Sequence, residues 1–386
     1  MNAQSLSFLQ QLMALPTPSG WESDGMRLAA QYLAPHVDRL HFDLHGNLHA
    51  VVNPEAPTRI MIEGHCDEIG LMVQYVDENG YLYMTAIGGL TVQLLAGERI
   101  VIQGPKGPVH GVFGVRPPHL MKTEEKDKVA PRDLDELCVD IGACSREEAL
   151  ASVELGSPAV VDAGWLPLLG DRVACRGFDN RIGAFTVVEV MRRMRAAAPG
   201  VAVHMVLTVQ EELGLVGATT AVHEVRPHIG ICVDVGFASD SQGNDKKLVG
   251  DVRLGKGPIL CFGPTYNPKL RQFLETVAQS RAIHLQRQVR GRGNNTNAWA
   301  MRTVRGGAAA ALISIPLRYM HSAVETLSLG DVRGAIDLIA AALAALPPQP
   351  DFSPDPPETA VPATGRRTSS RAGATKRAGN QTRRKS

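Results

Sequence analysis

The chain of 386 residues contains no long apolar run. No stretch approaches the ~18 consecutive apolar residues that identify a membrane helix. The opening from Met1 to Ser7 also lacks the charged-then-apolar order of a secretory signal peptide. We therefore expect a cytoplasmic protein with no membrane span.

Cysteine is scarce, and its spacing is not that of a thiolate metal site. No C-x-x-C pair occurs among the six cysteines, which are Cys66, Cys138, Cys144, Cys175, Cys232 and Cys261. Several stand in apolar, strand-like runs, so we expect reduced, buried side chains that act as small hydrophobic groups. The neighbours of Cys66 also show no base that would activate a nucleophilic thiol.

Neither sign of charge dominates the chain, which has 40 Lys and Arg, 39 Asp and Glu, and a formal net charge of +1. The charge is unevenly placed, because residues 366–386 carry eight Lys or Arg and no acid, which leaves an acidic body. Residues 347–386 are predicted to be a disordered basic tail that aids solubility or contacts anionic polymers or lipid headgroups weakly. The mixed-charge run from Lys122 to Lys128 has no interleaved aromatics and predicts a solvated loop. We expect no specific nucleic-acid partner.

The chain does contain five residues that are able to bind metal, each at the end of an apolar, strand-like run. They are His65, Asp179, Glu212, Asp234 and His321. Open α/β sheets bind ligands at the carboxyl ends of their strands, so these side chains are expected to meet on one rim. The pattern predicts a two-metal hydrolase.

Local context supports a metal at this rim. Asp67 is placed to accept the second ring N–H of His65, which would fix the orientation of a ligating imidazole. Glu211 and Glu212 are adjacent carboxylates after the run 203–209, and they would repel each other unless positive charge lay between them. A metal ion would supply that charge.

Strand and helix patterns alternate over residues 1–70 and 163–346 and indicate one catalytic α/β domain, a helix-sandwiched, mostly parallel sheet. Its expected helices are Met26 to Leu33, Ala184 to Arg195, Pro268 to Arg281 and Ser328 to Leu346. Over residues 71–162 the pattern changes to short strands with frequent Gly and Pro turns. That interval is predicted to be an inserted small β domain.

Several motifs carry a resemblance to a known family, and the likeness extends from residue 5 to about residue 345. The matching segments are 64–70 (GHCDEIG), 178–183 (FDNRIG), 208–218 (TVQEELGLVGA) and 313–325 (ISIPLRYMHSAVE). The chain resembles the M42 family of metallo-aminopeptidases, the glutamyl, deblocking and tetrahedral aminopeptidases.

The resemblance implies two divalent ions per subunit, Zn²⁺ or Co²⁺ and possibly Mn²⁺. It implies a ligand set with His65 and Asp234 on one ion, Glu212 and His321 on the other, and Asp179 bridging both. Glu211 would be the general base and Asp67 a further catalytic residue. By resemblance to the wider clan, the Asp179–Asn180 peptide is expected to be cis.

The implied activity is removal of N-terminal residues from short peptides by metal-activated water. A metal-dependent deacylase or deblocking amidohydrolase remains an alternative, because it would use similar metal geometry. A cellulase-type glycosidase, which needs two carboxylates and no metal, and an inactive assembly protein are further alternatives. Relatives use the β insertion to build dimers that assemble into dodecamers, so a homo-oligomer is expected.

One segment departs from the family pattern. Many relatives read Gly-Thr-Asp-Ala where this chain reads Asn295-Thr-Asn-Ala298. Asn297 replaces an acidic residue near the place that the resemblance gives to the substrate, and Trp299 is bulkier than the usual residue, so the sequence leaves the substrate side chain open. The acidic body is expected to disfavour strongly anionic peptides unless Arg253 or Arg318 lines the substrate pocket.

Overall fold

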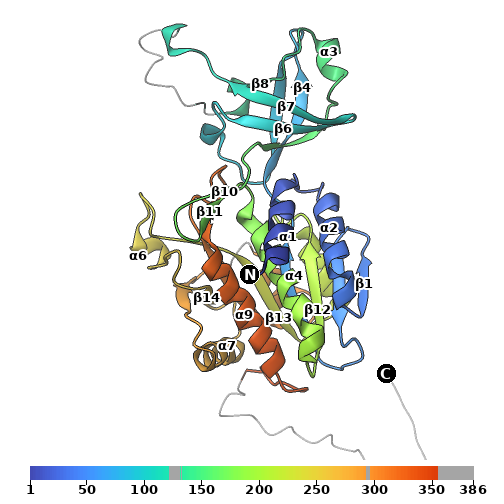
Figure 1. The fold of residues 1–386 in the computed structure, drawn as a ribbon, viewed down its shortest axis with the longest axis vertical. Helices are drawn as coiled ribbons and strands as arrows, with labels where there is room; N and C mark the ends of the chain where they lie inside the picture. Colours follow the sequence, from blue (N-terminus) through green and yellow to red (C-terminus); the bar gives the residue numbers. More distant parts are fainter. Residues whose placement is uncertain (121–130, 132, 293–295, 355–386) are drawn as a thin grey trace, which may run out of the picture. The chain divides into compact units, whose positions relative to one another are not determined.

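The computed structural model describes residues 1–120, 131, 133–292 and 296–354 (Figure 1). The charged run Lys122 to Lys128 and the basic stretch 366–386 lie outside the described residues, so both predictions stay untested. The elements below belong to the unit Met1–Phe352.

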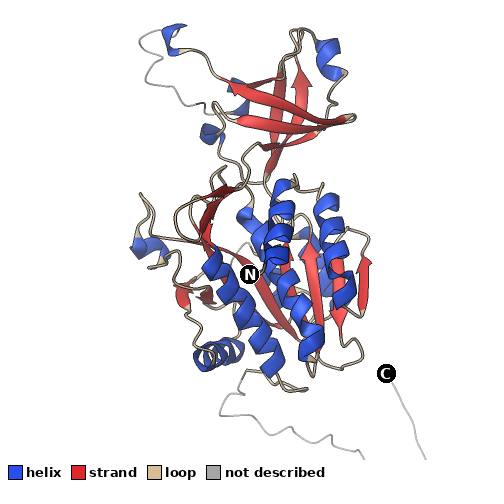
Figure 2. Ribbon diagram, in the orientation of Figure 1, coloured by secondary structure: helices blue, strands red, loops and turns tan. Residues whose placement is uncertain are grey.

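The fold contains a mixed β-sheet with helices on its two faces (Figure 2), and this sheet has eight strands. Its order is β1 (Arg39–Phe42), β2 (Leu48–Val52), β12 (Ala202–Thr208), β3 (Arg59–His65), β13 (Ile229–Phe237), β16 (Ala309–Leu317), β14 (Ile259–Phe262) and β15 (Gln286–Val289). The inner strands β12, β3, β13 and β16 pair in parallel, as do β14 and β15, whereas β1–β2, β2–β12 and β14–β16 are antiparallel. The inner strands are apolar almost throughout because both of their faces are buried.

Helices cover the two faces of this sheet. The larger core lies under α1 (Ala3–Ala14), α2 (Ser23–Leu33), α4 (Phe178–Ala197), α7 (Pro268–Ser280) and α9 (Leu329–Ala345). Alternate residues of β3 separate the faces, since Ile60 and Ile62 join this core while Met61 joins a second one. The second core lies under α5 (Val216–Val225) and α8 (Ala298–Thr303).

Local sequence sets where these helices begin. Asn267 accepts a hydrogen bond from the Leu270 backbone N–H at 2.9 Å, and Pro268 occupies the first turn, so α7 begins there. Ser328 similarly caps α9 by accepting from the Gly330 N–H at 3.2 Å. The four helices expected from the sequence are all present, with ends shifted by a few residues.

Six strands between residues 70 and 161 form a closed β-barrel. Its strands are β4 (Gly70–Val76), β5 (Leu82–Ile87), β6 (Arg99–Gly104), β7 (Gly107–Gly114), β8 (Cys138–Asp140) and β9 (Pro158–Val161), with the short helix α3 (Arg146–Leu150) before β9. Leu71, Ile100, Val139 and Ala159 pack inside it and form a third apolar core.

Further regular elements are a three-stranded antiparallel sheet of β10 (Leu166–Pro167), β11 (Arg172–Ala174) and β17 (Thr326–Ser328) and the short helix α6 (Lys246–Val249). The predicted α/β class is confirmed. In the part of the chain described here, no helix combines the length and apolar character that a membrane crossing requires. The cytoplasmic location stays a prediction.

Candidate metal centre

The five predicted ligands meet at one end of the parallel strands. His65 is the last residue of β3, Asp234 lies in β13, and Glu212 follows β12. Asp179 stands in the first turn of α4 and His321 in the turn after β16. They form two groups of candidate ligand atoms, one of His65, Asp179 and Asp234 and the other of Asp179, Glu212 and His321.

Asp179 belongs to both groups, and its two oxygens face different partners. Its Oδ1 lies 3.4 Å from His65 Nε2, whereas its Oδ2 lies 3.3 Å from His321 Nε2. Asp234 Oδ1 completes the first group at 4.0 Å from His65 Nε2, and Glu212 Oε1 completes the second at 3.3 Å from His321 Nε2. This is the arrangement that a carboxylate bridging two cations requires.

The backbone around Asp179 departs from a regular helix. Asp179 and Asn180 have non-helical dihedral angles within the span of α4. The peptide between them is cis, so the prediction made from the resemblance is confirmed. The Asn180 side chain donates to the Val233 carbonyl oxygen at 2.8 Å, which ties the start of α4 to the strand that carries Asp234.

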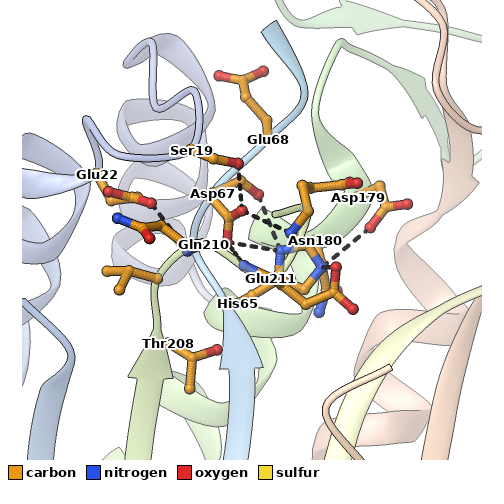
Figure 3. A network of polar contacts seen from close by, with 12 residues as sticks. Ser19, Glu22, His65, Asp67, Glu68, Asp179, Asn180, Thr208, Gln210 and Glu211 are labelled. Atoms are coloured by element: carbon orange, nitrogen blue, oxygen red, sulfur yellow. Dashed lines mark hydrogen bonds and ion pairs between the residues drawn. The ribbon is translucent and has the colours of Figure 1, made fainter. Parts of the chain in front are cut away.

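Asp67 organises the loop between β3 and β4 (Figure 3). Its carboxylate accepts hydrogen bonds from the Ser19 hydroxyl at 2.6 Å and from the backbone N–H groups of Glu211 and Glu212 at 3.0 and 3.1 Å. His65 Nδ1 lies 3.3 Å from Asp67 Oδ1 and donates to the Asp67 carbonyl oxygen at 3.1 Å. The Nε2 atom of His65 is thereby turned toward the other ligands.

Two further groups position His321 and Asp179, and the sequence analysis assigned a role to neither. The buried carboxylate of Glu325 accepts from the His321 N–H at 2.8 Å and from the Asp179 N–H at 3.0 Å. The carbonyl oxygen of Gly89, in the barrel segment after β5, accepts from His321 Nδ1 at 2.8 Å. The barrel segment therefore contributes directly to the orientation of a candidate ligand.

The electrostatics of the rim favour a bound cation. Burial, together with the Asp179 carboxylate, raises the pKa of Asp234 to about 7. Burial would also raise the pKa of Asp179, but hydrogen bonds from His321 and His65 hold it below its usual range. Hydrogen bonds to Asp179 and Glu212 raise the pKa of His321 to about 11. Without a cation, this many carboxylates can coexist only by holding protons on themselves or on the imidazoles.

Glu211 lies beside the two ligand groups that share Asp179 and is a member of neither. Its Oε2 is 3.9 Å from His65 Nε2, and the side chain is buried. Burial, followed by repulsion from Asp234, raises its pKa to about 9 despite the nearby His65. In the absence of a cation this carboxyl group therefore holds a proton at neutral pH, and positive charge at the centre would favour the carboxylate form that can accept one.

Comparison with known proteins agrees with this geometry. The model of the M42 glutamyl aminopeptidase family matches residues 46–338. The chain is 39% identical to lysyl aminopeptidase of Pyrococcus furiosus over 349 residues, which is 90% of this chain and 98% of that protein. This chain belongs to the M42 peptidase family. As a member, it is a peptide hydrolase of the aminopeptidase type.

Solved structures of TET peptidases share the fold. A TET aminopeptidase from a marine sediment Thaumarchaeota archaeon has a TM-score of 0.83 and 33% identity, covering 89% of this chain and 96% of that one. The TET1 peptidase of Pyrococcus horikoshii, which can assemble into a tetrahedron or a large octahedral shell, has a TM-score of 0.79 and 31% identity and covers 89% and 100%. The family recognised from the sequence motifs is thereby confirmed.

An open cleft leads to the candidate ligands of this M42 peptidase. Apart from those ligands, its lining is largely apolar, with Leu215, Phe237, Trp299 and Met320. Arg290 also lines the cleft. Neither Arg253 nor Arg318, the two basic residues considered from the sequence, is among the residues that line this pocket. Arg318 is paired with Asp240 at 2.7 Å, and Arg253 bonds Asp251 at 2.9 Å. Arg290, from the turn after β15, is the arginine among the described lining residues.

The two residues that depart from the family pattern have different surroundings in the structure. Trp299 lines the cleft, as expected. Asn297 does not, because it is buried and donates to Glu63 Oε2 and Thr208 Oγ1, both at 2.9 Å. Asn297 therefore does not line the cleft itself. Its amide instead donates to a carboxylate that is buried inside the sheet.

All six cysteines are free, as predicted, and four of them are buried. Cys144 is exposed and Cys138 is half-buried, because both belong to the barrel segment and lie near its surface, so the expectation of burial is wrong for these two. Burial raises the pKa of Cys66 to about 12, so its thiol is not a nucleophile at neutral pH.

Proposed function

We propose that this M42 peptidase is a co-catalytic two-metal aminopeptidase that removes N-terminal residues from short peptides. The observation that carries the proposal is the position of Asp179, whose two carboxylate oxygens face two separate sets of candidate ligands. A site for one ion would not need the second set. A glycosidase would leave the two histidines without a purpose.

The donors fit a pair of divalent ions. Each group offers one imidazole nitrogen and carboxylate oxygens without any thiolate, which suits Zn²⁺, Co²⁺ or Mn²⁺. His65 and Asp234 would hold one ion, Glu212 and His321 the other, and Asp179 both. When bound, such a pair polarises the scissile carbonyl group and lowers the pKa of water.

The remaining chemistry falls to the chain's own side chains. Glu211 would take the proton of the attacking water and return it to the leaving amine, because its buried side chain lies at the cleft beside the candidate ligands without belonging to either group that shares Asp179. Asp67 would keep the Glu211 loop and the His65 ring in fixed relation through its hydrogen bonds to both. We assign Asp67 as a positioning residue.

Substrate would occupy the cleft beside the ligands. Its apolar wall of Leu215, Phe237 and Met320 suits the side chain and early backbone of a peptide, and Trp299 limits the space that is left. These contacts support unfolded peptides as substrates, since a folded protein cannot bring its N-terminus into such a cleft without local unfolding.

We infer that the catalytic domain is made of residues 1–70 and 163–346, with the inserted β domain at 71–162 responsible for assembly. Support comes from the barrel core, which is separate from the two sheet cores, and from exposed apolar side chains on that segment, Tyr75, Tyr81 and Val112. Dimers made through this segment would build a larger closed particle, and such a shell would admit only short peptides.

Activity and metal content test the proposal together. Protein stripped with a chelator and then reloaded with Zn²⁺ or Co²⁺ should regain cleavage of aminoacyl nitroanilides and contain two ions at its candidate centre. N-acylated nitroanilides and a cellulosic substrate serve as comparison substrates. Cleavage of the acylated compounds alone would establish a deacylase, and chelator-resistant cleavage of the sugar would establish a glycosidase.

Assembly needs a separate measurement. Light scattering on the intact protein should give a particle well above dimer mass, and deletion of 71–162 should reduce it to monomer size. Activity of the deletion variant is not informative, because the deletion also removes the Gly89 carbonyl group that holds His321. A monodisperse intact monomer would refute the assembly proposal.

A further inference from the structure

A second cluster of metal-binding side chains lies outside the ligand set just described. It consists of His41 on β1, His49 on β2 and Glu224 in the last turn of α5. Each of the three offers one ligand atom, and these atoms lie within 4.8 Å of one another. The cluster is at the edge of the sheet, because β1 is its outermost strand.

The hairpin register brings the two imidazoles together. His41 and His49 are direct partners in the antiparallel pairing of β1 and β2, so both side chains project from the same face. Their rings stack with centroids 4.8 Å apart and planes inclined by 16°. Two nitrogen donors are thus held side by side by backbone pairing.

A side-chain contact fixes α5 beside this hairpin. Asn47, in the turn between β1 and β2, donates to the Gly217 carbonyl oxygen at 3.1 Å and to the Thr220 hydroxyl at 3.2 Å. Glu224 lies one turn further along the same helix, and its Oε1 is 3.0 Å from His41 Nε2. The third donor is therefore anchored by contacts that involve none of the three candidate ligands.

The partner of His49 is typical of a metal-bound imidazole. Its Nε2 lies 3.4 Å from Asp43 Oδ2, and Asp43 is held in turn by the backbone N–H groups of His45 and Asn47, both at 2.9 Å. A carboxylate that receives one ring N–H orients the ring and makes its other nitrogen a stronger donor.

A zinc-type ion would require the exposed side chains to rotate. Tetrahedral ligands at 2.0–2.2 Å from Zn²⁺ are about 3.3–3.6 Å from one another, whereas the three candidate ligand atoms lie within 4.8 Å of one another and the two imidazole rings are stacked. His41 and Glu224 are about half exposed, at 49% and 48% of their side-chain surface, so both can rotate to bring their ligand atoms toward His49. Their exposure also leaves room for water as a fourth ligand.

Charged groups of both signs surround the cluster. Arg39 pairs with Glu55 at 2.6 Å, and Arg59 donates to the carbonyl oxygens of Val225 and Arg226. Two carboxylates, Asp43 and Glu224, accompany the two imidazoles and would offset the charge of a divalent cation.

We propose that His41, His49 and Glu224 form an additional binding site for a Zn²⁺-type divalent cation, separate from the candidate catalytic centre. A bound ion would cross-link the β1–β2 hairpin to α5. That helix begins directly after the segment that carries Glu211 and Glu212, so the ion would stabilise the base of the catalytic loop. The site does not depend on the proposed function.

Crystals of the full chain soaked in Zn²⁺ or Co²⁺ provide a local test. An anomalous difference peak is expected between the three side chains, in addition to any peaks at the catalytic centre, which report that metal has entered the crystal. Filled catalytic positions with no density at His41, His49 and Glu224 would overturn the proposal.

Metal counting in solution provides a second test. After dialysis against Zn²⁺, His41→Ala and Glu224→Gln should each contain one ion fewer per chain than the unmodified protein while keeping peptidase activity. His45→Ala is the matched control, because His45 is exposed in the same turn and outside the cluster. Equal metal content in all four proteins would contradict the proposal.

Discussion

Asp67 holds the backbone of Glu211, since its Oδ1 accepts the Glu211 N–H at 3.0 Å while lying 3.3 Å from His65 Nδ1. One buried carboxylate thus joins the proposed general base to a proposed metal ligand. Because the contact uses the Glu211 main chain, the Glu211 carboxyl group stays available for proton transfer. Substitution of the Glu211 side chain should leave this framework intact.

Glu211→Gln should therefore keep its metal and lose turnover. We expect kcat to fall by at least ~10²-fold, as is usual when a general base is removed. Metal content measured by mass spectrometry should remain equal to that of the unmodified protein. Glu212→Gln is the comparison, because the loss of a ligand should lower both metal content and rate. Near-normal kcat in Glu211→Gln would show that the role assigned to Glu211 is wrong.

Gly88→Ala should weaken metal binding through the barrel segment. Gly88 has φ +78°, and an added Cβ would lie 3.0 Å from Ile69 Cγ2 and 3.3 Å from Glu212 Cβ. The substitution should displace the adjacent Gly89 carbonyl group from His321 and raise the metal Kd about tenfold, the lower end of the effect of losing an outer-shell partner.

Gly97→Ala is the matched control for this substitution. Gly97 has nearly the same backbone angle, φ +83°, but no atom within 4 Å of an added Cβ. Both variants meet the same backbone cost, of roughly 1–2 kcal/mol, yet only Gly88→Ala presses on the centre. Metal affinity is measured by titration. Equal affinity in the two variants would show that the barrel segment does not contribute to metal binding through His321.

Asn297→Asp should destabilise the fold. The amide of Asn297 donates to the fully buried carboxylate of Glu63, and an aspartate there would place a second buried acid in contact with it. We expect a loss of about 2–4 kcal/mol in the free energy of unfolding. The double variant Glu63→Gln/Asn297→Asp should recover much of this loss in denaturant unfolding, because one of the two acids is removed.

His204 should make stability depend on pH. Burial, helped by the nearby His49 and Arg59, lowers the pKa of His204 to about 4, whereas an unfolded histidine titrates near ~6.5. The unfolded chain therefore binds more protons between these values, so stability is complete above pH 6.5 and declines as the pH falls toward 4. The free energy of unfolding is measured for both proteins in the presence of chelator, and the unmodified protein should lose stability over this pH window relative to His204→Gln. Parallel pH profiles of stability for the two proteins would refute the assignment.

The candidate metal centre could be predicted from the sequence because its proposed ligands follow apolar runs that form strands. His65 and Asp234 end up close together because β3 and β13 pair in parallel, with Glu63 opposite Cys232. His321 follows no such rule, since it has φ +60° in a turn. The apolar run before it placed His321 at the rim, and the family motifs gave it the role of a ligand.

Other parts of the centre leave little trace in the sequence. Gly89 acts through a backbone carbonyl group, which every residue has, so its identity reveals nothing. Glu325 and Arg290 are charged residues in loops, and only the tertiary fold shows that one lies under the ligands and the other lines the cleft. Asn297 was predicted to lie near the substrate, because a polar residue between apolar ones can equally line a pocket or pair with a buried acid.

The ligands are spread along the chain from position 65 to position 321, and His321 is the last of them to be synthesised. A nascent chain on the ribosome thus lacks part of one ligand group until almost all of the fold has emerged. The barrel segment, which holds His321 through Gly89, has by then already been made. Incomplete chains and fragments that end before this turn should therefore be inert as peptidases, a safeguard for a hydrolase that is made among other unfolded chains.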